Sequence, residues 1–283
     1  MYFTGGIMNM EVIGYSERGV INSLIYNIFY SENNLEKIER FLSLICLPNL
    51  ENIENNIIIS DFSNINKAKI LIEQSFSDFG DCDLVILVEK TINSKPVKQA
   101  IFVEAKVKTG STKPWSIEKE YEKFAEFRKE KVAEGKEVYD YTLFSQLYSK
   151  VILVELAKKG IIISKEISKG CFWAKRDDKL RKIGENKVVR KAFEKIKEYC
   201  ENDNTLFITI SPDNIKNLIN FFENKTTVWW PLCKIEEECK NRFSMDYIQR
   251  WGFIPWESIM EFCRQNDLTD AINVLEFNEG QIY

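Results

Sequence analysis

Two short apolar runs, each interrupted by charged residues, constrain the fold of this chain most strongly. Residues 79–89 and 99–108 are rich in β-branched and apolar side chains, and turn residues lie between them. This pattern predicts an antiparallel β-hairpin. Period-two alternation puts Glu104 and Lys106 on one face of the second strand, while Asp83 begins the first strand. We therefore expect two carboxylates and a lysine to converge at one end of the hairpin.

Charged side chains in an apolar strand need a physical reason, because they must be paired, hydrated or bound to metal. Two carboxylates suit a hard cation such as Mg²⁺, with Mn²⁺ as the alternative, because Mg²⁺ keeps several waters and takes few protein ligands beside a phosphate. A neighbouring lysine can orient an attacking water or stabilise developing negative charge.

These residues together resemble the PD-(D/E)XK nuclease superfamily, whose signature is an acid, a spacer, and an acid-x-lysine on the next strand. The matching residues are Asp83 and Glu104-Ala105-Lys106, with Gly80 leading into the first strand. Asp81 is the competing first acid, but Asp83 directly abuts the strand. The proline of the family name is absent here. The resemblance covers residues 10–160.

The resemblance implies an α/β fold with a restriction-endonuclease-like core, in which helices flank a mixed central sheet. The family core consists of a helix, three strands, a helix and a further strand. The resemblance also implies a Mg²⁺-dependent DNA endonuclease of restriction or defence type, with RNA as the alternative substrate. Asp83 and Glu104 would hold the metal, and Lys106 would position the water.

Two further residues follow from the same resemblance. Residues 15–29 fit the first helix, so Glu17 is the expected helix acid, which would ligate a second metal or hold a metal-bound water; the alternative is a first-turn glutamate that complements the helix dipole. Some relatives carry a glutamine after the lysine strand and a tyrosine four residues later. Gln146 is a weak candidate for that glutamine, since Tyr148 does not have this spacing.

The chain contains no histidine, which excludes several enzyme classes. Ser-His-Asp hydrolases, Cys-His proteases and H-E-x-x-H metalloproteases all require it. The seven cysteines show no C-x-x-C spacing, so they indicate neither a zinc ribbon nor a disulfide framework. Cys82 lies beside the proposed metal acid, but without a histidine base we favour a buried reduced thiol over a nucleophile.

Positive charge is concentrated after the expected nuclease core. Residues 150–200 hold fifteen Lys and Arg against seven Asp and Glu, whereas the whole chain has a net charge of −4. Such a segment could bind a phosphate backbone, although exposed lysines also solvate ordinary helices. The candidate nucleic-acid contacts are Lys108, Lys175, Arg176, Arg181, Lys182, Lys187, Arg190 and Lys191.

Hydrophobic periodicity and turn residues predict the remaining elements. We expect helices over residues 35–47, 116–134 and 141–159, and strands over residues 57–60, 67–76, 171–175 and 206–210. Glu73 lies on the expected strand 67–76 and could face the acids, but a solvated strand residue is favoured.

We expect a nuclease-like domain over residues 10–222 and an aromatic-rich, mostly helical extension over residues 223–283. Trp229, Trp230, Trp251 and Trp256 concentrate in this extension, where a packed core is favoured over base stacking. No apolar run reaches the length of a membrane-spanning helix, so we expect a cytoplasmic protein. A homodimer would give two cuts, but no interface is evident in the sequence.

Two other classes of function compete with the nuclease. A catalytically silent protein could keep the nuclease-like core and bind DNA or a protein partner. A purely structural interaction protein would leave the strand charges at Glu104 and Lys106 unexplained unless they pair with each other or with solvent.

Overall fold

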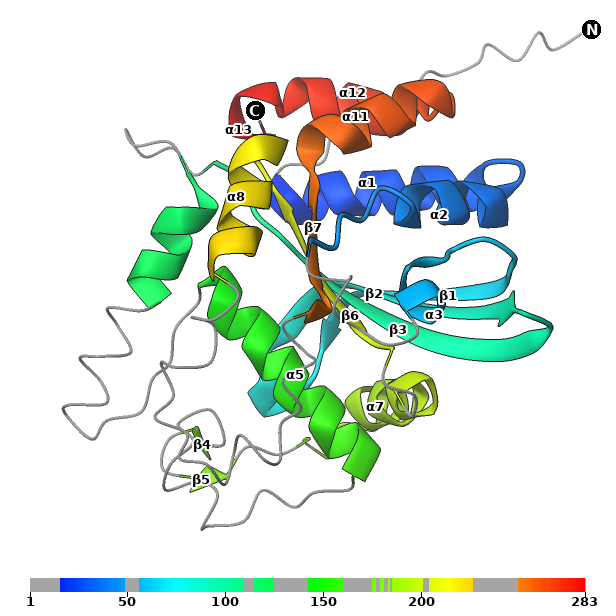
Figure 1. Cartoon of the computed structure of the whole chain (residues 1–283), viewed down its shortest axis with the longest axis vertical. Coiled ribbons are helices and arrows are strands. Elements are labelled where there is room, and N and C mark those ends of the chain that lie inside the picture. Colours follow the sequence, from blue (N-terminus) through cyan, green and yellow to red (C-terminus); the bar gives the residue numbers. More distant parts are fainter. Residues whose placement is uncertain are drawn as a thin grey trace, which may run out of the picture.

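The computed structural model describes residues 16–48, 56–108, 115–124, 142–159, 175–176, 179–180, 183, 185–200, 204–225 and 249–282. In these residues a five-stranded mixed sheet is flanked by helices on both faces (Figure 1). This confirms the predicted α/β class. None of the helices in the described ranges combines the length and the apolar character that crossing a membrane requires.

The central sheet has the strand order β1-β2-β3-β6-β7. Its strands are β1 Ile65–Ser75, β2 Asp81–Ile92, β3 Lys95–Ala105, β6 Leu206–Ser211 and β7 Trp251–Pro255. The first three form an antiparallel meander, while β6 and β7 add in parallel beside β3. The predicted hairpin and the strands predicted at 67–76 and 206–210 are confirmed.

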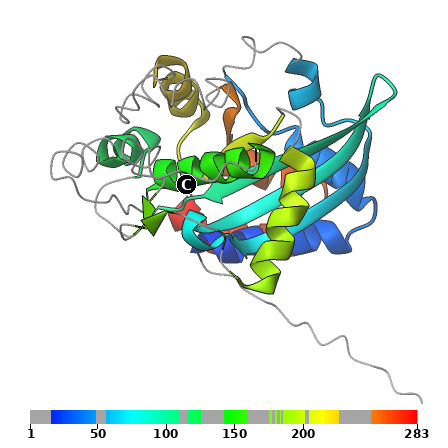
Figure 2. The same cartoon turned by 90° about the horizontal axis from the view of Figure 1, so that it is seen from below.

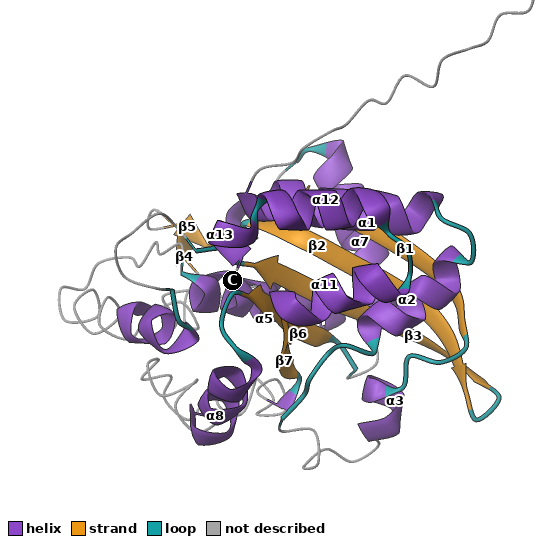
Figure 3. Ribbon diagram, turned by 90° about the horizontal axis from the view of Figure 1, so that it is seen from above, coloured by secondary structure: helices purple, strands orange, loops and turns teal. Residues whose placement is uncertain are grey.

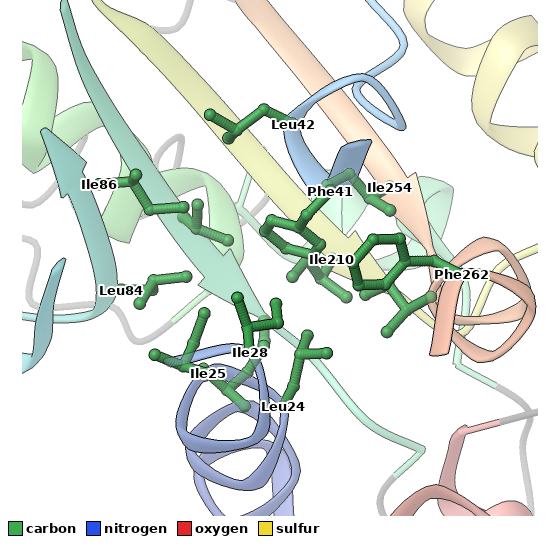
Figure 4. Packing of buried hydrophobic residues seen from close by; sticks show 14 of the residues in the cluster. Leu24, Ile25, Ile28, Phe41, Leu42, Leu84, Ile86, Ile210, Ile254 and Phe262 are labelled. Carbon is green, nitrogen blue, oxygen red and sulfur yellow. The ribbon is translucent and has the colours of Figure 1, made fainter. Parts of the chain in front are cut away.

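One face of the sheet is covered by four helices that come from the two ends of the chain (Figure 3). They are α1 Ser16–Tyr30, α2 Asn34–Leu42, α11 Trp256–Gln265 and α12 Thr269–Phe277, and α13 Glu279–Ile282 follows. Figure 4 shows Leu24, Ile25 and Ile28 of α1 pointing toward the sheet, where Leu84, Ile86 and Ile210 lie in the same core.

The opposite face is covered by α5 and α7, which cross the strands (Figure 2). The helices on this side are α5 Leu143–Lys159, α7 Lys187–Cys200 and α8 Ile215–Lys225, together with helical residues 117–124. Strand alternation separates the two cores: Val85 and Phe102 face α5, whereas Leu84 and Val103 face α1.

Two expectations need revision. The strand expected at residues 57–60 is wrong, since these residues lie in helix α3 Asn56–Ser60. Two polar side chains of the sheet stabilise the end of this helix: Gln99 donates to the Ile59 carbonyl, and Lys90 donates to the Asp61 carbonyl. Such tertiary hydrogen bonds override the local strand propensity of the three isoleucines.

The segment 223–283 also contributes more than helices. Its strand β7 completes the central sheet, and Trp251 and Trp256 are buried. The sequence analysis did not predict this strand. Of the strand expected at 171–175, residues 171–174 lie outside the described residues; Lys175 belongs to β4 Lys175–Arg176, which pairs with β5 Lys179–Leu180. Trp229 and Trp230 also lie outside the described residues.

Candidate active site

Asp83 and Glu104 meet across the β2–β3 hairpin. The ladder between β2 and β3 ends at the pair Leu84–Val103, and Asp83 and Glu104 are the residues that follow this pair on the two strands. Both acids are buried, and Asp83 Oδ2 accepts a 2.9 Å hydrogen bond from the Ala105 amide. The hairpin therefore brings the two predicted carboxylates together.

Glu104 carries a buried carboxylate whose pKa is raised. It is 0% exposed, and neither carboxylate oxygen has a hydrogen-bond partner among the described residues. Burial raises the pKa of Glu104 to about 7, and the Asp83 charge adds to this shift, while Lys150 and Lys106 oppose it. A cation at this carboxylate would favour the ionised form.

The sequence analysis did not predict that Lys150 is the cation nearest to Glu104. Lys150 Nζ lies 3.4 Å from Glu104 Oε1 and donates hydrogen bonds of 3.0 and 2.8 Å to the carbonyls of Phe79 and Asp81. It therefore links α5 to the turn before β2. A signal was present in the sequence, because Lys150 lies three residues after Leu147 on the apolar face predicted for this helix.

Lys106 directly follows β3, and its charge acts on Glu104. Its amide donates to the Ile210 carbonyl and its carbonyl accepts from Trp256 Nε1, both at 2.8 Å, so its backbone is held between β6 and α11. The side chain is half-buried. Its charge lowers the pKa of Glu104 less than that of Lys150 does.

Helix α1 presents an arginine to the acids. Arg18 Nε lies 3.9 Å from Asp83 Oδ1, and Arg18 Nη1 lies 3.5 Å from Glu73 Oε2. Asn22 also donates to Glu73 at 2.8 Å. Glu73, expected as a solvated strand residue, is thus exposed but held by α1. The sequence analysis did not predict Arg18.

Glu17 is half-buried in the first turn of α1 and lies one turn before the buried Ile21. In the part of the chain that the structure describes, no group of three or more His, Cys, Asp or Glu side chains is arranged to hold a metal ion. Glu17 therefore does not join Asp83 and Glu104 in such a group.

Gln146 lies on α5, one turn before Lys150. Its Oε1 is buried and has no hydrogen-bond partner among the described residues. Lys150 takes the position, four residues after the glutamine, that the resemblance gives to a tyrosine. The side chain of Tyr148 lies outside the described residues.

The candidate nucleic-acid contacts are dispersed. Lys108 is half-buried just after β3, while Lys187, Arg190 and Lys191 are exposed on α7. Lys175 and Arg176 form β4; Arg181 and Lys182 lie outside the described residues.

The C-terminal half of α7 does not approach the two acids. Its Tyr199 donates to Glu89 Oε1 at 2.6 Å. Glu89 lies six residues along β2 from Asp83, which is about 20 Å at strand spacing. This part of α7 therefore lies at the far end of β2 from the site.

Cys82 is fully buried, and its thiol lies 3.3 Å from the Leu84 carbonyl. Burial raises the pKa of this thiol well above its usual value, with Glu104 adding to the shift. A protonated, inaccessible thiol is a poor nucleophile, so Cys82 acts here as a packed core residue.

In comparisons with known proteins, no family model, no curated protein and no solved structure matches this chain. The likeness to the PD-(D/E)XK superfamily therefore rests on the motif residues and on their arrangement described above.

Proposed function

We propose that this chain is a Mg²⁺-dependent nuclease that hydrolyses phosphodiester bonds in DNA, as a restriction- or defence-type endonuclease. The observation that carries the proposal is that Asp83 and Glu104 meet at one end of the hairpin, where Asp83 accepts a hydrogen bond from the Ala105 amide and the charges of Asp83 and Lys106 both act on Glu104. Buried, neighbouring carboxylates are costly to keep, and binding a cation is the function that most directly offsets the cost.

The order of the elements supports the same proposal. Helix α1 is followed by the meander β1–β3, then by α5 and α7, and then by β6 parallel to β3. Apart from α2 and α3 after α1, and the second helix before β6, this follows the order of helix, three strands, helix and strand that the resemblance implies. The two acids lie at the carboxyl-terminal end of β3, β6 and β7, where ligands of open α/β sheets commonly bind.

The residues present fit a divalent cation of the Mg²⁺ type. Both oxygens of Glu104 lack a hydrogen-bond partner among the described residues, and Asp83 is held beside it by the Ala105 amide. Two carboxylates leave room for the waters that Mg²⁺ retains. When bound, the metal would supply Lewis-acid activation of water and charge stabilisation at phosphorus.

The protein side chains would have separate roles. Asp83 and Glu104 hold the cation, and Lys106 orients the water that attacks phosphorus in line with the leaving oxygen. Glu17, in the first turn of α1, would ligate a second metal or hold a metal-bound water. Arg18 partly neutralises the negative charge at the site, because its guanidinium lies beside the carboxylates of Asp83 and Glu73.

The alternative function is a catalytically silent nuclease-fold protein that binds DNA or a protein partner. Two contacts favour it specifically: Lys150 forms an ion pair with Glu104, and Arg18 lies 3.9 Å from Asp83. Both carboxylates thus already have cationic neighbours in the protein itself.

A cleavage assay separates the two functions. Purified full-length protein is incubated with supercoiled DNA, linear DNA and RNA in Mg²⁺ or Mn²⁺. We expect cleavage that falls at least about a hundredfold in Asp83→Asn, Glu104→Gln and Lys106→Met. Asp81→Asn is the matched control, because Asp81 lies on the same strand but is exposed.

The cleavage result is interpreted only for variants that are shown to be folded. If all variants are folded and wild type cleaves none of the substrates, the nuclease proposal fails and the binding function takes its place. If Asp81→Asn loses activity while Asp83→Asn keeps it, the assignment of the first acid is wrong.

A further inference from the structure

Two hydroxyl side chains of β6 lie beside the proposed site on the same face of the sheet. The parallel register pairs Glu104 with Thr209 and Ala105 with Ile210. Carried one step further, it sets Ser211 beside Lys106. Strand alternation places Thr209 and Ser211 on the face of Phe207, which belongs to the core under α5.

Both hydroxyls are buried without partners. Thr209 is 1% exposed and Ser211 is 0% exposed, and neither hydroxyl oxygen has a hydrogen-bond partner among the described residues. The two oxygens of Glu104 also lack a hydrogen-bond partner among the described residues, although Oε1 lies 3.4 Å from the ammonium of Lys150. A buried polar atom without a hydrogen bond costs about 1–3 kcal/mol. Several such oxygens, which lie on one face of the neighbouring strands β3 and β6, therefore indicate a polar ligand between the strands.

The ligand must be small. All of these oxygens are closed to solvent, which excludes a group as large as a nucleotide without rearrangement. The ionised form of Glu104 attracts a cation, whereas a neutral hydroxyl is suited to hydrogen-bond the waters that a divalent cation keeps.

We propose that Thr209 and Ser211 are positioning residues of the cation site, whose hydroxyls bind the waters around a divalent cation held by Glu104. This inference rests on the proposed function. It adds β6 to a site that the sequence motif confines to β2 and β3.

The test compares three threonine variants of the full chain. Thr209→Val removes the hydroxyl at nearly constant volume, and Thr209→Ser restores it. Thr205→Val is the matched control, because Thr205 is equally buried and its hydroxyl also lacks a partner among the described residues. It lies four residues earlier in the chain, about 13 Å away at strand spacing.

The first readout is the Mg²⁺ concentration that gives half of the Mg²⁺-induced rise in Tm, which needs no catalysis. We expect this concentration to rise about tenfold in Thr209→Val, as for the loss of one hydrogen bond near a charge, and to stay near the wild-type value in Thr209→Ser and Thr205→Val. Without Mg²⁺, Thr209→Val should be at least as stable as wild type, because it removes an unpaired hydroxyl. Ser211→Ala should likewise need more Mg²⁺ for half of the rise in Tm and should be at least as stable as wild type without Mg²⁺.

The second readout is cleavage at saturating DNA. If wild type binds Mg²⁺ and cleaves, but Thr209→Val and Thr205→Val behave alike in both readouts, the β6 inference is overturned and the nuclease proposal stands. If wild type shows neither a Mg²⁺-induced rise in Tm nor cleavage, the nuclease proposal fails and the β6 inference fails with it.

Discussion

The ammonium of Lys150 lies 3.4 Å from Glu104 Oε1, and both side chains are 1% exposed. A buried ion pair contributes little net stability, but removing one partner leaves an uncompensated charge in the core. This pair therefore gives the first prediction.

We predict that Lys150→Met lowers the free energy of unfolding by about 3–5 kcal/mol at pH 8, measured by urea denaturation. The loss should be smaller at pH 5, where Glu104 takes up a proton. Lys123→Met is the matched control, since Lys123 also lies 3.4 Å from a glutamate, Glu120, but its side chain is 69% exposed. Exposed pairs contribute little, so equal losses in the two variants would contradict the buried pairing.

The raised pKa of Glu104 makes stability depend on pH. The native state holds the proton up to about pH 7, against an ordinary value of 4.5, so it binds more protons than the unfolded chain between these values. The contribution of this group to stability is therefore greatest below pH 4.5 and falls as pH rises to about 7.

Glu104→Gln should remove this dependence. Relative to wild type, the variant should gain about 3 kcal/mol of stability between pH 5 and pH 8 without divalent metal, measured by urea denaturation across that range. Parallel pH profiles of the two proteins would show that Glu104 is ionised throughout.

Cys82 should be chemically silent in the folded protein. Because burial raises its pKa and closes it to solvent, iodoacetamide at pH 8 should modify it only after unfolding, as read by peptide mass spectrometry. The half-exposed Cys46 should react sooner. Cys82→Ala should retain cleavage, and loss of cleavage in a folded variant would instead assign the thiol a role.

Gly252 tests the docking of β7 against the segment before α3. A Cβ there would lie 2.5 Å from the Cys46 carbonyl oxygen and 2.7 Å from Leu47 Cδ2. We predict that Gly252→Ala lowers the free energy of unfolding by about 1–3 kcal/mol, because the backbone at Cys46 or at residue 252 must move to make room for the Cβ. Gly280→Ala is the control: its Cβ would meet nothing within 4 Å, so thermal denaturation should show no loss.

The sequence by itself determined the hairpin, the alternation of its side chains between the two faces of the sheet, and the α1 helix. Local periodicity decides these features, so Asp83 and Glu104 could be predicted to meet from their places on consecutive antiparallel strands.

Only the tertiary structure decided which cations and hydroxyls surround the acids. Lys150 reaches Glu104 because α5 packs across the sheet, and Thr209 lies beside it because β6 joins β3 in parallel. Trp251 joins the same sheet from the far end of the chain. Parallel pairing and helix packing join residues about 40 to 150 positions apart in the chain. Sequence periodicity predicts which face of an element a residue occupies, but it does not predict which distant residue lies beside it.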